Sequence, residues 1–384
     1  MYVVKYTKPK MAIPELEDLM NDVVCKRRSR RIESTIVKKC NDLSNESLPF
    51  FDPAKWMRDA NTLLSAINNF IKNQDLNRYY HVISIPKTNG KTRTIHDPNK
   101  SMRVVHDLMM DWLSPYMYYH TSAFAYIKKR NIYDCIQRHQ GNESKWFLHI
   151  DLKDFFGQTN YDFAMRQIFS IYPFCSLSQE DQKVVKSILK IAFLNNGLPQ
   201  GTTISPALTN LIMLPIDHKI YGDMHKKGMV YTRYADDIII SSTYDFDYEK
   251  IIRRIKTIFD QFGAPYQIND EKTRYGSSSG KNWNLGLMLN KDNQITVGYR
   301  AKKLMKAKLT AYYLDQQNNV DQSAHENQKM FGQLAFYKMI EPHTMNYIER
   351  KLSSKFNVKS KKHIKSANRP RQCFVFQDID LPFF

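Results

Sequence analysis

The chain has 384 residues, of which 42% are hydrophobic, and it carries a formal net charge of +19. This length allows roughly two or three domain-sized units, and the hydrophobic fraction excludes a chain that is disordered throughout. A charge so far from zero is typical of proteins that bind a polyanion, with nucleic acid as the first candidate and a membrane surface as the alternative.

The cysteines and the apolar runs bear on where the protein works. The five cysteines are scattered and form no Cys-x-x-Cys pair, which favours buried thiols in a reducing compartment over disulfides or a zinc site. No apolar run approaches the roughly 20 residues that cross a bilayer, and the residues after Met1 are not typical of a signal peptide. We therefore expect a cytoplasmic protein with no membrane partner.

Residues 1–75 are predicted to form a helical N-terminal extension, because apolar residues such as Leu64, Ile67 and Ile71 recur at helical spacing. A dense basic cluster lies within this extension. It is either a solvated helix face or, as the net charge favours, a contact for RNA phosphates. The cluster consists of Lys26, Arg27, Arg28, Arg30 and Arg31.

Residues 79–98 predict a β-hairpin, since two β-type runs flank an Asn-Gly turn. The hairpin carries Lys87, Lys91 and Arg93. These cations either bind an anion or keep an exposed sheet edge soluble. Residues 101–145 are then expected to be helical.

An apolar run from Trp146 predicts a strand that ends at the carboxylate of Asp151. After a helical stretch at about 160–194, Gly197-Leu-Pro-Gln-Gly201 reads as a turn before a helix that begins near Ser205. In this turn Gln200 can hydrogen-bond the sugar or base of a nucleotide, and Gly201 allows the backbone to approach a nucleotide closely.

Residues 229–242 predict a second hairpin with two adjacent acids, Asp236 and Asp237, at its turn. Asp is common in solvated turns. However, adjacent ionised carboxylates repel each other unless a cation lies beside them. If the Asp151 strand lies beside this hairpin, the three carboxylates form an oxygen-rich site suited to Mg²⁺.

The remainder of the chain reads as a helix at 248–263, a hairpin at about 283–298 and further helices at 301–349. Residues 351–371 contain eight Lys or Arg and no acid. This basic tail, with Lys361 and Lys362, is either solvated or bound to RNA. The apolar end at 374–384 is typical of a segment that docks on the body of the protein or on a second copy, so a homo-oligomer is one expectation.

Three boxes together resemble the palm motifs of reverse transcriptases, with the bacterial retron-type group as the nearest likeness. The boxes are Asp151-Leu-Lys-Asp-Phe-Phe156, Gly197 to Asn210, and Tyr234-Ala-Asp-Asp237. The resemblance implies an α+β right-hand polymerase fold with an antiparallel palm sheet and a helical thumb. We assign the N-terminal extension to 1–75, the fingers to 76–145, the palm to 146–290 with a fingers insertion at about 160–200, the thumb to 291–350, and the basic C-terminal tail to 351–384.

The same resemblance implies an RNA-directed DNA polymerase that uses dNTPs and two Mg²⁺ ions, for which Mn²⁺ could substitute. The ions are expected on Asp151, Asp236, Asp237 and the carbonyl of Leu152. Arg93, with either Lys87 or Lys91, is expected to contact the triphosphate. Phe156 matches the steric gate that excludes a ribose 2′-hydroxyl, although an aromatic side chain can equally be core. Lys272 matches a lysine near the pyrophosphate leaving group.

Neither an RNase H-like acidic cluster nor a Cys/His array is found in the sequence, which disfavours a mobile group II intron protein. Retron enzymes carry Val-Thr-Gly before the thumb, where this chain has Asn284-Leu-Gly286, and their Asn…His motif between fingers and palm is absent here. A defence-associated reverse transcriptase fits better, with a structured non-coding RNA as template partner and cDNA as product. The alternatives are untemplated synthesis by the same site, RNA synthesis, and an idle RNA-binding scaffold.

Overall fold

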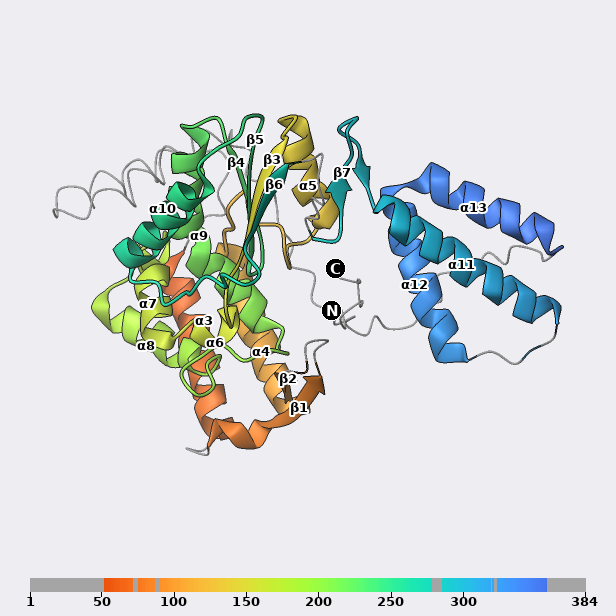
Figure 1. Ribbon diagram of the computed structural model, residues 1–384. Helices are drawn as coiled ribbons and strands as arrows, with labels where there is room; N and C mark the ends of the chain where they lie inside the picture. Colours follow the sequence, from red (N-terminus) through yellow and green to blue (C-terminus); the bar gives the residue numbers. More distant parts are fainter. Residues whose placement is uncertain are drawn as a thin grey trace.

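The computed structural model describes residues 52–71, 75–86, 90, 92–277, 285–318, 320 and 323–357 (Figure 1). Several predicted nucleic-acid and phosphate contacts lie outside these residues and stay predictions. They are Lys26, Arg27, Arg28, Arg30 and Arg31 of the N-terminal extension, Lys87 and Lys91 of the first hairpin, and Lys361 and Lys362 of the tail.

A four-stranded sheet in the order β4-β5-β3-β6 forms the centre of the larger body. All of its strand pairs are antiparallel, and Asp151 is the register partner of Asp237. The predicted pairing of the acidic strand with the acidic hairpin is therefore confirmed. The strands are β3 (Trp146–Asp151), β4 (Val230–Tyr234), β5 (Asp237–Ser242) and β6 (Arg274–Ser277).

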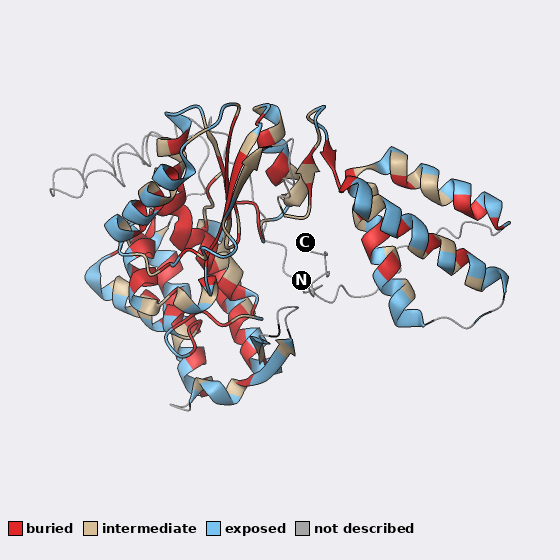
Figure 2. Ribbon diagram, in the orientation of Figure 1, coloured by how far each residue is buried: buried red, intermediate tan, exposed pale blue. Residues whose placement is uncertain are grey.

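Both faces of this sheet are covered, which explains why its central strands are almost continuously apolar. Leu148 and Ile240 belong to the main core on the side of helix α9 (Ile204–His225). Their neighbours Phe147 and Ile239 belong instead to a second core on the opposite face. Figure 2 shows the buried residues concentrated at the sheet and on the inner sides of the helices.

Helix α9 is the central helix of the body, and most of its length is buried. It contacts β4, α10 and α7, and Figure 1 shows it between the sheet and the outer helix α10. The helices on this side of the sheet are α6 (Phe155–Gln158), α7 (Tyr161–Ile168), η3 (Phe174–Ser176), α8 (Gln179–Lys190) and α10 (Tyr248–Phe262).

The first part of the described chain packs below the sheet in Figure 1 and ends in the predicted hairpin, β1 (Tyr80–Pro86) with β2 (Thr92–Pro98). Its two long helices are joined by Trp56 and Trp112, whose rings stack with centroids 4.5 Å apart. The other elements of this part are α3 (Pro53–Ile71), η1 (Leu76–Tyr79), α4 (Lys100–Leu113) and η2 (Ser114–Tyr116). Helix α5 (Ile132–Gly141) lies beside the sheet instead and contacts β4 (Figure 1).

One expectation for this region was wrong. Residues 101–145 were expected to be helical, but 117–131 form an irregular loop between η2 and α5. The loop is stabilised by hydrogen bonds that come from far along the chain, among them one from the amide nitrogen of Arg233 to the carbonyl of Ser122 (2.7 Å). Local helical spacing cannot show such contacts.

The C-terminal part forms a separate three-helix unit after a short hairpin (Figure 1). Its core includes Leu309, Leu334 and Leu352, one from each helix, and belongs to the same cluster as Phe147 and Ile239 of the sheet. This core is continuous with the sheet's second face. The elements are β7 (Met288–Leu289), β8 (Ile295–Thr296), α11 (Gly298–Gln317), α12 (Ala324–Ile340) and α13 (Pro342–Lys355). No helix in the described part of the chain is long and apolar enough to cross a membrane.

Candidate active site

The three predicted acids meet at one end of the sheet. Asp151 is the last residue of β3, Asp237 is the first residue of β5, and the two are register partners. Asp236 lies in the turn between β4 and β5, where Ala235 adopts a left-handed conformation with φ of 57°. The amide nitrogen of Leu152 donates to the carbonyl of Asp236 over 3.1 Å, so the two acidic segments are tied together.

Two side chains from the turn before β6 bind the carboxylate of Asp151. The Nζ atom of Lys272 lies 2.9 Å from Oδ1, and the Nδ2 atom of Asn269 lies 3.1 Å from Oδ2. The amide nitrogen of Asn269 also donates to the carbonyl of Asp151 over 2.8 Å. Lys272, predicted from the resemblance, therefore lies at the acids. Asn269 was missed, although it lies only three residues before Lys272.

His149 binds the third acid and was also missed. Its Nε2 atom lies 3.0 Å from Oδ1 of Asp237. Residues two apart on a strand point to the same face, so His149 shares a face of β3 with Asp151. The alternation was visible in the sequence, but the partner strand that brings Asp237 within reach was needed to show the contact.

The electrostatics of the cluster favour a bound cation. The pKa of Asp236 is raised to about 7, first by loss of solvent around its carboxyl and then by the carboxylates of Asp237 and Asp151. A divalent cation reverses this effect by compensating the negative charge. Three carboxylates supply the hard oxygen donors that Mg²⁺ prefers, so the donor set fits such an ion.

As they stand, the side chains of the described residues form no group of three or more His, Cys, Asp or Glu that is arranged to hold a metal ion. In this arrangement Lys272 binds Asp151 and His149 binds Asp237.

Phe156, the predicted gate, lies in the short helix α6 at the edge of the core. Its neighbour Phe155 is 2% exposed, whereas Phe156 is half-buried and packs on the rim of the same core. The carbonyl of Phe156 accepts a hydrogen bond from the amide of Leu198 over 3.0 Å. A Cβ atom on Gly197 would lie 2.4 Å from the carbonyl oxygen of Gly157. The segment that carries Phe156 is thus bound to the Gly197–Gly201 turn by backbone contacts.

The same turn contacts the strand that carries Arg93. The amide of His96 in β2 donates to the carbonyl of Gln200 over 2.7 Å. Gly201 has φ of 110°, and a Cβ atom there would lie 2.6 Å from Cγ2 of Ile95. The structure therefore requires glycine for packing against the hairpin, while the predicted close approach to a nucleotide stays a prediction.

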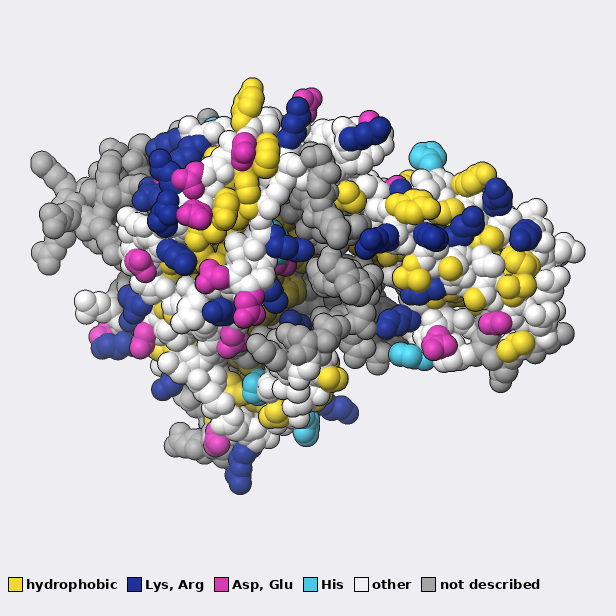
Figure 3. Space-filling model, in the orientation of Figure 1, with side chains coloured by type: hydrophobic (Ala, Val, Ile, Leu, Met, Phe, Trp, Pro, Cys, Tyr) yellow, Lys and Arg dark blue, Asp and Glu magenta, His cyan; other side chains and the backbone are white. Residues whose placement is uncertain are grey.

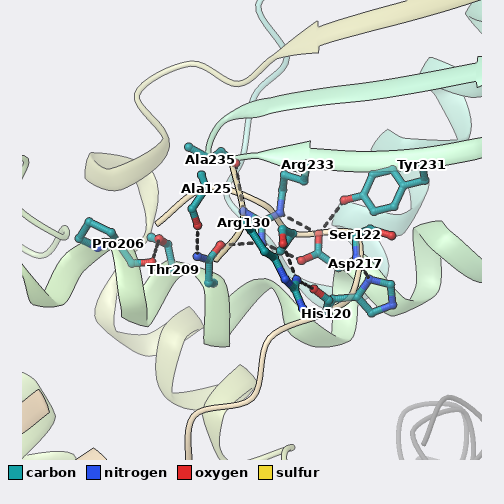
Figure 4. Close-up of polar contacts among 12 residues, drawn as sticks. His120, Ser122, Ala125, Arg130, Pro206, Thr209, Asp217, Tyr231, Arg233 and Ala235 are labelled. Atoms are coloured by element: carbon teal, nitrogen blue, oxygen red, sulfur yellow. Dashed lines mark hydrogen bonds and ion pairs between the residues drawn. The ribbon is translucent and has the colours of Figure 1, made fainter. Parts of the chain in front are cut away.

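The buried guanidinium of Arg233 contacts the backbone of the acidic turn, and this contact was not predicted. Arg233 is fully buried, and its Nε and Nη2 atoms donate to the two carboxylate oxygens of Asp217 over 2.8 and 2.7 Å. Its Nη1 atom donates to the carbonyl of Ala235 over 3.1 Å, and Nη2 also donates to Oδ1 of Asn210 over 3.1 Å. Figure 4 shows these contacts converging on Arg233 from α9 and from the turn. Arg233 thus connects the left-handed residue of the acidic turn to the central helix.

Residues 85–326 of the chain match the family model described as reverse transcriptase (RNA-dependent DNA polymerase). The chain belongs to this family. The reverse transcriptase has the right-hand polymerase fold expected from the sequence, is an RNA-directed DNA polymerase, and is similar to retron reverse transcriptases. Enzymes of this family generally use divalent metal ions.

The chain is also similar to named relatives and to solved structures. Retron Ec73 reverse transcriptase of Escherichia coli is 28% identical over 275 residues, which cover 70% of this chain and 85% of the relative. Retron Mx65 reverse transcriptase of Myxococcus xanthus is 25% identical over 287 residues, covering 71% of this chain and 64% of the relative. Among solved structures, apo telomerase from Candida tropicalis covers 79% of this chain and 63% of its own, with a TM-score of 0.45 and 14% identity.

Proposed function

We propose that this reverse transcriptase makes cDNA from dNTPs on a structured non-coding RNA, with Asp151, Asp236 and Asp237 as its catalytic residues. The observation that carries the proposal is the register of the palm sheet, which makes Asp151 the partner of Asp237 and places Asp236 in the adjoining turn. Carboxylates from three positions of the chain converge at one sheet end, as a nucleotidyl-transfer site requires.

In the proposed reaction, the 3′-oxygen of a primer attacks the α-phosphorus of the incoming dNTP. A new P–O bond forms, the bond from the α-phosphorus to the bridging oxygen breaks, and pyrophosphate leaves. Two Mg²⁺ ions, held by the three carboxylates and the carbonyl of Leu152, would activate the 3′-hydroxyl and neutralise the triphosphate. Lys272, whose ammonium lies 2.9 Å from Asp151, would stabilise the leaving group.

The residues around the acids are assigned to the nucleotide. Arg93 of β2 would bind the phosphates, while Gln200 and Gly201 would bound the sugar and base. The ring of Phe156 would exclude the ribose 2′-hydroxyl, because a bulky ring leaves no room for the extra oxygen. The hydrogen bond between His96 and Gln200 supports this assignment, since it brings the Arg93 strand and the glycine turn together.

Electrostatics and similarity support the RNA partner. The net charge of +19 favours binding to a phosphate backbone. Figure 3 shows a row of Lys and Arg side chains across the three-helix unit; helix α11 contains Arg300, Lys302, Lys303, Lys306 and Lys308. A role in bacterial antiphage defence is proposed from the resemblance of the sequence motifs, and two relatives are retron reverse transcriptases of Escherichia coli.

A primer-extension assay tests the synthesis. Purified protein is given Mg²⁺, labelled dNTPs and a primed RNA, with and without RNase pretreatment. We expect incorporation by the wild type, none by Asp236→Asn, and wild-type incorporation by the matched control Asp260→Asn, whose carboxylate is exposed on α10. Incorporation by Asp236→Asn would refute the assigned site, and RNase-resistant incorporation without template would establish untemplated synthesis instead.

The same pair of variants tests the biological role. Phage plating efficiency is measured in cells that carry the gene with its native flanking sequence. The proposal expects protection by the wild type and by Asp260→Asn, and loss of protection with Asp236→Asn. Equal plating efficiency for all three would refute the defence role while leaving DNA synthesis untouched.

A further inference from the structure

Tyr126 is a large aromatic residue that is exposed beside the acids. It lies in the loop at 117–131, and it is 61% exposed. Its ring meets the ring of Phe156 edge to face, with centroids 6.4 Å apart and an interplanar angle of 62°. Its φ is 60°, a left-handed conformation that costs a non-glycine residue free energy and persists only where the surroundings enforce it.

The surroundings do enforce it, because the loop is bound on both sides. On the sheet side, the amide of Phe124 donates to the carbonyl of Arg233 over 2.9 Å. On the helix side, Nδ2 of Asn210 donates to the carbonyl of Ala125, the residue directly before Tyr126, over 2.9 Å. Figure 4 shows Ala125 between these two sides, next to Arg233 and Ala235.

The guanidinium of Arg130 links two backbone carbonyls of the same loop. Its Nη1 atom donates to the carbonyls of His120 and Ala123 over 2.7 and 2.6 Å. The backbone that carries Tyr126 is therefore fixed by hydrogen bonds before any ligand arrives. A ligand that binds the exposed ring does not have to order the loop that bears it.

The hydroxyl of Tyr126 interacts electrostatically with the acids and with Arg93. Although much of the residue is accessible, its pKa is raised to about 12, first by loss of solvent around the hydroxyl and then by the carboxylate of Asp236, with Arg93 acting in the opposite direction. The hydroxyl of Tyr126 is therefore within electrostatic range of the acidic turn and of the strand that carries the predicted triphosphate arginine.

We infer that Tyr126 is a nucleotide-contacting residue, whose ring forms with Phe156 a two-ring wall against the sugar and base of the incoming dNTP. This inference rests on the proposed function, since it concerns the same site. The contact is made by the ring face, because aromatic stacking with a base needs only a π-surface. Tyr126 also packs against the edge of Phe156, so it positions the gate as well as the nucleotide.

Single-nucleotide insertion kinetics test the inference with Tyr126→Ala, Tyr126→Phe and the control Tyr244→Ala, a residue that is 80% exposed just after β5. Loss of a stacking contact predicts an increase of about tenfold in the KM for dNTP with Tyr126→Ala, with kcat within about twofold of wild type. Tyr126→Phe and Tyr244→Ala are expected to keep the wild-type KM. A KM for Tyr126→Ala within twofold of wild type would overturn the inference.

A binding measurement keeps this outcome separate from failure of the proposed function. Labelled dNTP is titrated into the protein with a primed RNA whose primer ends in a dideoxynucleotide, so that no synthesis can occur. If the wild type binds dNTP but makes no DNA, the proposed function fails while the inference still requires weaker binding by Tyr126→Ala. Equal dNTP binding by the two proteins, or none by the wild type, would overturn it.

Discussion

The Nε2 atom of His149 lies 3.0 Å from Oδ1 of Asp237, across the pair of strands that also holds Asp151 opposite Asp237. This contact fixes the orientation of a carboxylate that is proposed to bind metal. Groups that hold a metal-binding side chain in place are worth about 10- to 100-fold in metal affinity or activity. We therefore predict that His149→Leu raises the Mg²⁺ concentration needed for half-maximal dNTP incorporation by about tenfold.

The measurement is a Mg²⁺ titration of primer extension at saturating dNTP. His149→Gln keeps a side-chain hydrogen-bond donor near Asp237. If this donor is what supports Mg²⁺ binding, His149→Gln should have a Mg²⁺ dependence between those of the wild type and His149→Leu. His225→Gln, an exposed histidine on α9, serves as the control. An unchanged Mg²⁺ dependence in His149→Leu would mean that the contact with Asp237 has no role once the ions are bound.

A second prediction concerns the gate. Removing the ring of Phe156 with Phe156→Ala should raise the kcat/KM for a ribonucleotide, while that for the matching deoxynucleotide falls modestly, because space opens at the 2′-position. The ratio of the two values is expected to shift by about 100-fold, as expected when a steric exclusion is removed. Phe169→Ala, which removes a similarly half-buried ring in the main core, should leave the ratio unchanged. A constant ratio in Phe156→Ala would assign Phe156 to packing alone.

Gly201 and Gly222 give a matched pair for the third prediction. Gly201 has a left-handed φ of 110°, and a Cβ atom there would lie 2.6 Å from Ile95, whereas nothing lies within 4 Å of a Cβ atom at Gly222. Gly201→Ala should displace the β1–β2 hairpin from the glycine turn, and we expect at least a tenfold loss of dNTP incorporation. Gly222→Ala should be active and slightly more stable, because alanine is favoured over glycine in a helix. Full activity in Gly201→Ala would show that the hairpin contact is dispensable.

Much of the palm could be predicted from local patterns. The run before Asp151 and the runs around Asp236 and Asp237 each carry the composition of a strand, and acids at strand ends converge once the strands pair. The register that makes Asp151 the partner of Asp237 confirms this reasoning. Such features depend on residues close together in the sequence, so composition and alternation reveal them.

The parts that could not be predicted depend on contacts between distant segments. Arg233 occupies a strand position where a charged residue is usually exposed, yet its guanidinium is buried against Asp217 of the central helix. The loop before α5 was predicted to be helical, but Asn210 and Arg233 hold it in an irregular path. No local pattern specifies either arrangement, because each exists only after α9 packs on the sheet.

The fourth prediction separates stability from positioning at this buried pair. Arg233→Met leaves the carboxylate of Asp217 buried, still hydrogen-bonded by the hydroxyl of Tyr231 at 2.6 Å. Breaking such a buried ion pair costs about 3–5 kcal/mol. The double variant Arg233→Met/Asp217→Leu removes both charges and should recover most of the stability that Arg233→Met loses. The thermal midpoints of unfolding of the two variants and the wild type provide the comparison. The activity of the double variant should stay low, because the carbonyl of Ala235 has lost its donor. Recovery of both stability and activity would show that Arg233 contributes no positioning of the acidic turn.

The last prediction concerns acid stability. Burial lowers the pKa of His106 to about 4, and burial is likewise the main cause that lowers the pKa of His120 and of His139 to about 3. In the unfolded chain all three regain the ordinary histidine pKa of about 6.5. Below that pH the unfolded state therefore binds protons that the folded state excludes, so stability is full above about pH 6.5 and is lost as the pH falls toward 4.

With three such histidines, the free energy of unfolding should fall by about 4 kcal/mol per pH unit near pH 5, at about 1.4 kcal/mol for each proton. His139→Asn removes one proton-binding group and should reduce this slope by about a third, even though loss of the hydrogen bond to Ser241 at 2.6 Å lowers stability at pH 7. His325→Asn, an exposed residue on α12, should leave the slope unchanged. Thermal midpoints measured between pH 7.5 and pH 4.5 provide the test, and a slope that His139→Asn does not change would show that His139 does not stay neutral in the folded protein.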